Sequence, residues 1–273
     1  MWHPMSESLV YTGGRDGAIS LWDLRMNPSV RLSSGSTGLR SVATIVHAHQ
    51  VVGSSPEPTI TGLVLQDTAT YNVISSCSAN GFLRLWDLRS TNTYLSCSSL
   101  DPTVYNHRQS RGIVSLVSGV KESDGTIFGL GTDARIYVYC VLDLNVYSSQ
   151  NPCDSLWGSP SFYVKSSLSP CGRWLAYGGG PHNGDAFIFS VARDTRLDVG
   201  PIHAVRLRGG SSSSCGVDWS SDSLAVCAEA GRVRIWRSDP GKRRECEIQP
   251  DINKNKWSWA TTISQKHGYY NRI

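Results

Sequence analysis

Leu21-Trp22-Asp23-Leu24-Arg25 is a pentapeptide that the chain repeats unchanged as Leu85-Trp86-Asp87-Leu88-Arg89. Each copy closes a short apolar segment that follows a glycine turn, Asp16-Gly17 in the first case and Asn80-Gly81 in the second. A short strand, an Asp-Gly or Asn-Gly hairpin turn and a second strand that ends on Trp-Asp form the inner hairpin of a WD-repeat blade. The repeated stretch therefore predicts an all-β chain folded as a WD-repeat β-propeller.

Three further segments carry the same pattern, each with an aromatic residue near the end of its expected third strand. Together with the two pentapeptides, these aromatic residues are Trp22, Trp86, Tyr139, Phe189 and Trp236. A blade takes about 40–45 residues, and the intervals here are longer, so the excess is expected in loops, chiefly in a polar insertion over about 26–59. We interpret residues 1–238 as four and a half to five visible blades, and residues 239–273 as a polar, basic C-terminal tail.

The outer strands are expected at less regular places. Trp2-His3-Pro4 resembles the end of an outer strand, which would leave most of the innermost strand of the first blade missing. Residues 45–49 and 93–96 are expected as fourth strands, and residues 145–160 as a loop. The last blade is expected from three strands, at residues 214–219, 223–228 and 232–236.

The visible blades do not make up a closed ring, because the first blade begins part-way through. Propellers close with about 4–8 blades and so remove their sheet edges. We therefore interpret the chain as a truncated propeller, and we expect an open edge that promotes aggregation.

The composition fits a globular protein of one domain, since all-β propellers run long as single domains. The chain has 273 residues, 40% hydrophobic and 18% charged, and a formal net charge of +4. A net charge this small does not indicate direct binding to nucleic acid or to a membrane surface. The N-terminus lacks the basic and apolar regions of a signal peptide, and no apolar run approaches the ~20 residues that cross a bilayer.

Eight cysteines are scattered along the chain and none forms a Cys-x-x-Cys pair, so a zinc ribbon is not expected. Several occupy expected strand positions, where a free cysteine behaves as a small apolar residue. We interpret this as the mark of a reducing compartment, with disulfides as the alternative. The cysteines are Cys77, Cys97, Cys140, Cys153, Cys171, Cys215, Cys227 and Cys246.

Three stretches resemble one family, the denticleless-like WD-repeat proteins. They are Thr12–Gly17 running into the first pentapeptide, the second pentapeptide hairpin, and Ser161-Phe162-Tyr163-Val164-Lys165-Ser166-Ser167-Leu168-Ser169-Pro170. The last is the most specific, because generic WD repeats seldom carry it where an inner strand is expected. The resemblance covers most of residues 1–260 and begins part-way into the family's propeller. It departs in the last blade, where Arg237 follows Trp236 in place of an Asp.

Members of this family are substrate receptors of cullin-RING ubiquitin ligases, and the resemblance gives the Asp-Leu-Arg endings a role. Residues two apart in a strand point to the same side, so Asp23 and Arg25 lie together, as do Asp87 and Arg89. In the family, this double motif docks the receptor on the ligase's propeller adaptor, of the damaged-DNA-binding family. The alternative is that each Asp caps its turn and each Arg is a solvated rim residue.

Other residues of the repeats are expected to be structural. Trp22, Trp86 and Trp236 would pack between blades, and Asp16, Asn80 and Asp133 would accept backbone hydrogen bonds in hairpin turns. The face that these turns build is the expected substrate face. Its candidates, for which plain turn residues are the alternative, are Arg15, Asp133, Arg173, Asn183 and Asp185. The resemblance implies that the substrates are replication proteins bound to the sliding clamp PCNA.

The remaining signals point to no catalysis, no cofactor and no metal. His47-Ala48-His49 has the residue types of a metal site, but two strand-end histidines at a blade junction explain it better. The chain has no Gly-x-Ser-x-Gly nucleophile elbow, and Gly178-Gly179-Gly180-Pro181 lacks the Lys-Ser/Thr of a phosphate loop. Lys242-Arg243-Arg244 is either a nuclear import signal or a solvated charge run.

The sequence thus favours a non-catalytic receptor that brings replication or cell-cycle proteins to a ubiquitin ligase. We expect it in the nucleus and also in the cytoplasm. The alternative is a WD-repeat scaffold for protein–protein interaction outside the ubiquitin system, which would be indifferent to Arg25 and Arg89.

Overall fold

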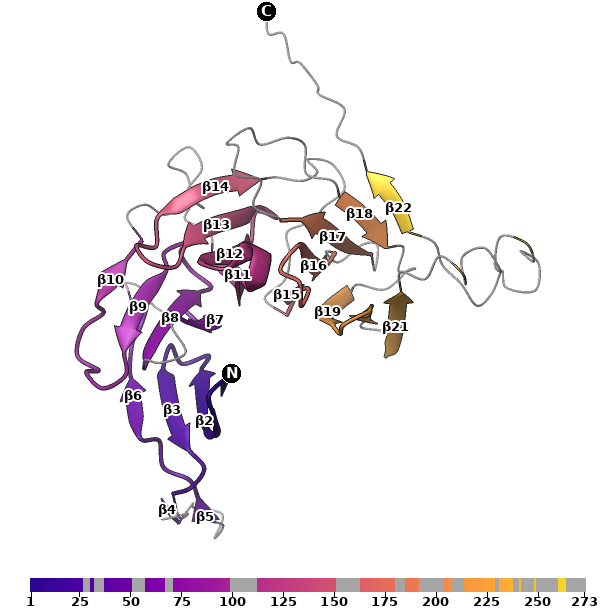
Figure 1. Ribbon diagram of the computed structural model, residues 1–273. Helices are drawn as coiled ribbons and strands as arrows, with labels where there is room; N and C mark the ends of the chain where they lie inside the picture. The colour runs from indigo at the N-terminus through magenta and orange to yellow at the C-terminus, as the bar shows by residue number, and fades with distance from the viewer. Residues whose placement is uncertain are drawn as a thin grey trace, which may run out of the picture. The chain divides into compact units, whose positions relative to one another are not determined.

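The computed structural model is an all-β chain whose strands form antiparallel sheets, as the WD-repeat pattern predicts (Figure 1). It describes residues 1–26, 30–31, 37–50, 57–66, 71–98, 112–150, 163–179, 185–191, 204–207, 214–228, 231–237, 241, 248 and 260–263. The chain divides into two compact units: Met1–Ser118 with Gly125–Ser149, and Gly119–Asp124 with Gln150–Ile273. Among the described residues, no helix has the length and apolar character to cross a membrane.

The first blade belongs to the first unit and has four strands in the order β1-β2-β3-β6. They are β1 (Trp2–His3), β2 (Ser6–Gly13), β3 (Ile19–Asp23) and β6 (Ala43–Ile45). β1 pairs with β2 and is therefore the innermost strand, so the assignment of Trp2-His3-Pro4 to an outer strand was wrong. The outer strand β6 also ends at Ile45, where the expected strand over residues 45–49 begins. A small hairpin, β4 (Val30–Arg31) with β5 (Thr37–Gly38), lies within the predicted insertion.

The second blade has the strand order β10-β9-β8-β7 and the third has β11-β12-β13-β14. The second comprises β7 (Ile60–Leu65), β8 (Asn72–Cys77), β9 (Arg84–Asp87) and β10 (Ser96–Cys97). The third comprises β11 (Ile113–Ser118), β12 (Thr126–Gly131), β13 (Ile136–Cys140) and β14 (Val146–Gln150).

β14 lies within the loop expected over residues 145–160, so that prediction was wrong for residues 146–150, and residues 151–160 lie outside the described part. The turn before β14 is closed by the Cys140 N–H, which donates to the Asn145 carbonyl at 2.9 Å and starts the pairing. The polar composition of residues 148–150 concealed this strand.

The core of the first unit lies between its blades. One buried cluster joins Leu9 and Tyr11 of the first blade to Val73, Trp86 and Leu88 of the second. A separate cluster joins Ile74 and Leu85 of the second blade to Ile113, Tyr137 and Tyr139 of the third. Successive residues of a strand point to opposite faces, and so the neighbours Val73 and Ile74 enter different clusters. The odd-numbered residues of β8 therefore face the first blade.

The second unit contains two sheets. One has the order β15-β16-β17-β18-β22 and the other has β19-β20-β21. The first comprises β15 (Ser166–Leu168), β16 (Trp174–Gly178), β17 (Ala186–Ser190), β18 (Ala204–Leu207) and β22 (Ala260–Ile263). The second comprises β19 (Ser214–Trp219), β20 (Ser223–Ala228) and β21 (Arg232–Arg237). β15 is shorter than the inner strand expected over residues 161–170, whose first two residues lie outside the described part. β22 falls within the predicted tail and pairs with β18. A short 3-10 helix, η1 (Lys121–Ser123), also belongs to this unit.

Candidate protein-docking site

The two Asp-Leu-Arg endings form turns of the same kind at the ends of β3 and β9. The Met26 N–H donates to the Asp23 carbonyl at 3.1 Å, and the Ser90 N–H donates to the Asp87 carbonyl at 3.0 Å. Each turn thus reverses the chain immediately after the Trp-Asp pair. A turn at this position fixes where the next two side chains lie.

Each Asp carboxylate does two things at once. It accepts the backbone N–H of the Arg two residues later, at 3.0 Å in the first copy and 2.9 Å in the second. It also accepts two bonds from the guanidinium: Nε to Oδ1 at 2.9 and 3.0 Å, and Nη2 to Oδ2 at 2.7 and 2.8 Å. Each Asp thus both caps its turn and pairs with its Arg, so the capping role does not by itself decide between adaptor docking and a solvated arginine.

The guanidinium groups stay open to solvent although they are held in place. The side chains of Arg25 and Arg89 are 72% and 67% exposed, whereas those of Asp23 and Asp87 are 16% exposed. Hydrogen bonds from Arg25 lower the pKa of Asp23 to about 2, and those from Arg89 lower the pKa of Asp87. Both carboxylates are thus ionised at neutral pH, and each orients its arginine through a bidentate pair.

The two turns lie on neighbouring blades of one compact unit. Leu9 is the β2 partner of Asp23, and it shares a buried cluster with Leu88, which follows Asp87. The copies differ in their middle residue, since Leu24 is 50% exposed and Leu88 only 2%. The first turn therefore offers an apolar side chain beside its arginine, and the second does not.

The third blade carries a related turn that lacks the arginine. Tyr139 occupies the Trp position, and the turn after β13 contains Asp143 and Asn145. Asn145 donates its backbone N–H and its side-chain Nδ2 to the Asp143 carboxylate at 3.0 and 2.8 Å. The hydrogen-bond pattern is kept without a guanidinium, so two consecutive blades of the first unit present the arginine.

The tryptophans of the pentapeptides donate to side chains of the neighbouring strand. Trp22 Nε1 donates to Thr12 Oγ1 at 2.8 Å, and buried Trp86 Nε1 donates to Ser75 Oγ at 2.9 Å. Trp236 packs partly buried against a cluster in the second unit. The contacts of Trp22 lie within its own blade, whereas Trp86 also belongs to the buried cluster shared by the first and second blades.

His49 contacts the same Ser75 hydroxyl group as Trp86, and the sequence did not reveal this contact. Its Nε2 lies 2.8 Å from Ser75 Oγ, and its side chain is fully buried. Burial, reinforced by the nearby charge of Arg84, lowers the pKa of His49 to about 3, so the ring is neutral. The other histidine, His47, contacts the Glu57 carboxylate through its Nδ1 instead. In the described part of the chain, no three His, Cys, Asp or Glu side chains gather as metal ligands would.

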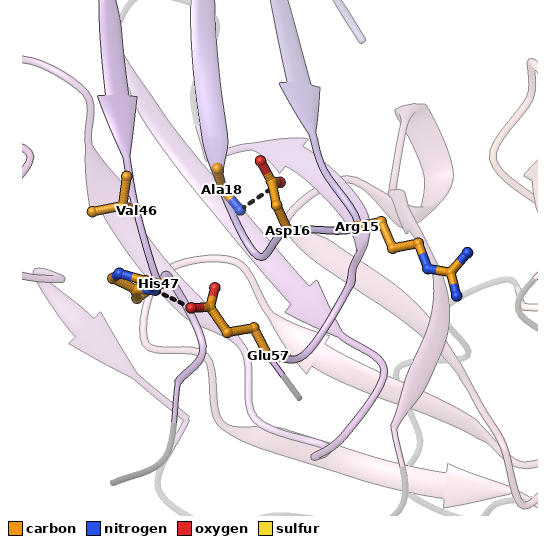
Figure 2. A pocket seen from close by; sticks show the side chains of 6 residues that line it. All are labelled: Arg15, Asp16, Ala18, Val46, His47 and Glu57. Atoms are coloured by element: carbon orange, nitrogen blue, oxygen red, sulfur yellow. Dashed lines mark hydrogen bonds and ion pairs between the residues drawn. The ribbon is translucent and has the colours of Figure 1, made fainter. Parts of the chain in front are cut away.

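A shallow pocket of about 470 Å³ lies at the other end of β3, beside the Asp16-Gly17 turn (Figure 2). It is lined by Arg15, Asp16, Ala18, Val46, His47 and Glu57. The Asp16 carboxylate accepts the Ala18 N–H at 3.2 Å, as expected of a turn residue. Figure 2 shows the Arg15 side chain extending away from the His47–Glu57 pair.

The other substrate-face candidates are engaged within their own units. Asp133 accepts the Tyr137 hydroxyl and the Arg135 N–H in the first unit. In the second unit, Asp185 is buried and paired with Arg206, and Arg173 forms a bidentate pair with Glu122 at 3.0 Å for each bond. Asn183 lies outside the described residues. Of the four candidates that the structure describes, Arg15 alone lines the pocket, and its side chain is exposed.

Comparison with known proteins finds relatives of one kind. The chain is 32% identical over 228 residues to the cell division cycle protein cdt2 of Schizosaccharomyces pombe, covering 82% of this chain and 44% of that protein. It is 29% identical over 248 residues to the protein lethal(2)denticleless of Drosophila melanogaster, covering 84% and 30%. It is 27% identical over 254 residues to the human denticleless protein homolog, covering 84% and 32%. The chain thus spans less than half the length of these relatives.

No protein-family model matches the chain. Among solved structures, a chain of the mitotic checkpoint complex superposes with a TM-score of 0.58 at 16% identity, covering 85% of this chain and 59% of that one. At this identity the likeness supports the propeller fold alone.

Proposed function

Because this chain is a homologue of the denticleless and Cdt2 proteins, we propose that it is a non-catalytic substrate receptor of a cullin-RING ubiquitin ligase. It docks on the ligase's propeller adaptor through the turns that hold Arg25 and Arg89. The observation that supports this proposal is the pair of exposed guanidiniums, held in the same bidentate geometry on consecutive blades.

The geometry suits a rigid contact with another protein. A guanidinium has five N–H donors, and the Asp uses only its Nε and one Nη2 proton. The remaining donors are free for carboxylate or carbonyl oxygens of a partner. Each arginine side chain is already held by its Asp, so it loses little conformational freedom when a partner binds. This reduces the entropic cost of association.

The opposite ends of the strands would receive the substrate. The pocket beside Arg15 is the feature that supports this part of the proposal, because it lies at the end of β3 remote from Arg25. Replication and cell-cycle proteins, including those bound to the sliding clamp PCNA, are the proposed substrates. This choice, and the proposed nuclear location, follow from the resemblance to the denticleless-like family.

The competing function is a WD-repeat scaffold outside the ubiquitin system. It is favoured by the fact that both Asp carboxylates cap their own turns, which any WD-repeat blade could use. In that case the arginines would be solvated and dispensable.

A pull-down of the adaptor from cell extract separates the two functions. The bait is the wild-type chain, the Arg25→Ala/Arg89→Ala variant, or a charge-matched Arg15→Ala/Arg232→Ala control that also removes two exposed arginines. Circular dichroism checks that all three fold. We expect the first variant to lose at least about tenfold in retained adaptor, since truncating a contact arginine commonly costs more than about 1 kcal/mol. Equal retention by both double variants would overturn the proposal in favour of the scaffold.

A further inference from the structure

Tyr71 lies next to the second Asp-Leu-Arg turn. It directly precedes β8, whose first residue, Asn72, is the register partner of Asp87. The Leu88 N–H donates to the Tyr71 carbonyl at 3.2 Å, which fixes the Tyr71 backbone against the turn that holds Arg89.

The side chain of Tyr71 is directed toward the first blade. Val73, two residues later, is buried in the cluster shared with Leu9. Residues two apart in an extended segment point to the same side. Leu9 is in turn the partner of Asp23, so this direction leads from the second turn toward the first.

The electrostatics agree with a position between the two pairs. The pKa of Arg25 and the pKa of Arg89 are both raised, chiefly by hydrogen bonds to their own Asp partners, and Tyr71 adds to the rise in each. The side chain of Tyr71 therefore lies within electrostatic reach of two guanidiniums on different blades. The Tyr71 side chain is 39% exposed, so its ring and hydroxyl are partly available on this surface.

We infer that Tyr71 is the central contact of the docking surface between Arg25 and Arg89, and that Leu24, which is exposed and precedes Arg25, adds apolar area to this surface. The inference rests on the proposed function and specifies the partner surface. Tyrosine and arginine are the residue types that dominate binding energy at interfaces, and tyrosine offers a large contact area with little entropy to lose. The surface fits an adaptor segment in which an apolar side chain, seated on Tyr71 and Leu24, is flanked by carboxylate or carbonyl oxygens for the two arginines.

Binding of purified adaptor to the immobilised chain tests this inference. The variants are Tyr71→Ala, Tyr71→Phe and Leu24→Ala. Tyr147→Ala, which truncates an exposed tyrosine on β14 of the third blade, is the matched control. We expect Tyr71→Ala to weaken binding by about tenfold or more, as for a central contact. Tyr71→Phe and Leu24→Ala should each cost a few-fold, and the control should bind as the wild type does.

The outcomes separate this inference from the proposed function. If Tyr71→Ala binds as tightly as the wild type while Arg25→Ala/Arg89→Ala does not bind, the docking proposal stands and the role of Tyr71 is refuted. If neither variant changes the affinity, both fail. Hydroxyl-radical footprinting of the wild-type complex gives a readout that needs no substitution: the adaptor should protect Tyr71 from oxidation, and unchanged oxidation of Tyr71 would overturn the inference.

Discussion

His49 shows how one buried side chain can support the fold of a blade. Ser75 receives the indole N–H of Trp86 and meets the His49 ring, so three residues from three segments share one hydroxyl group. A buried polar group that loses its partner costs about 1–3 kcal/mol. The network therefore ties the segment after the first blade to the second blade.

The neutral state of His49 makes stability depend on pH. Its folded-state pKa of about 3 lies below the ordinary value of 6.5, so the unfolded chain binds the additional proton between these values. Stability is therefore complete above pH 6.5 and falls as the pH decreases toward 3. Urea denaturation should show a loss of about 2 kcal/mol from this group between pH 7 and pH 5. In His49→Gln the pH-dependent loss should be smaller by that amount; an identical pH dependence in both proteins would contradict this prediction.

The sequence revealed residues whose roles are local and concealed those whose roles depend on distant partners. Asp23, Arg25, Asp87 and Arg89 could be found because the pentapeptide is repeated and the interacting groups are two residues apart. The partner of His49 is 26 residues away, at Ser75. Tyr71 belongs to no motif, and only the pairing of β8 with β9 brings it to the second turn.

Strands were predicted best where both neighbours in the hairpin are close in sequence. β19 and β20 have the expected bounds, and β3 and β9 end on the expected Trp-Asp pairs. The outer strands were predicted worst, because they are short and pair on only one side. β6 (Ala43–Ile45) differs from the prediction because it has only three residues, whereas β14 (Val146–Gln150) was missed because residues 148–150 have the polar composition of a loop.

A hairpin turn of the second unit depends on a glycine in a way that a substitution can isolate. Gly172 has a φ of +78°, and a Cβ at this position would clash with the Val120 carbonyl oxygen. Gly125 has nearly the same φ, +77°, with nothing within 4 Å of its Cβ position. Gly125→Ala should therefore cost about 1–2 kcal/mol through backbone strain alone. Gly172→Ala should cost about 2 kcal/mol more, since the clash is with backbone. Equal losses in denaturant melts would show that the close approach to Val120 is not rigid.

At the scale of the whole molecule, the WD-repeat pattern places different groups at the two ends of a strand. β3 carries the Asp16-Gly17 turn and the pocket at one end, and the exposed Arg25 at the other. If the proposed function holds, a partner bound at one end therefore need not compete with a partner bound at the other. The fold class could be predicted from the repeat, whereas the occupants of the two ends could not, because exposed side chains are under no packing constraint from the chain itself.

The edge of the last sheet leads to a prediction about self-association. Among the described residues, the sheet β19-β20-β21 has three strands, and β21 is at its edge. Val233 and Ile235 on this strand are 64% and 62% exposed, whereas the equivalent strands β9 and β13 are largely buried. An exposed apolar edge strand is a template for pairing with another chain.

We expect the isolated chain to self-associate as its concentration rises, because burying two such side chains contributes roughly 1.5–3 kcal/mol each. Val233→Lys/Ile235→Lys should shift sedimentation-velocity profiles to the monomer, since charged residues on an edge strand oppose pairing. Leu142→Lys/Tyr147→Lys, at two exposed positions of the third blade, is the control and should leave association unchanged. If both double variants associate like the wild type, the contact between chains lies elsewhere than on β21. If both become monomeric, general charge repulsion rather than this edge controls association.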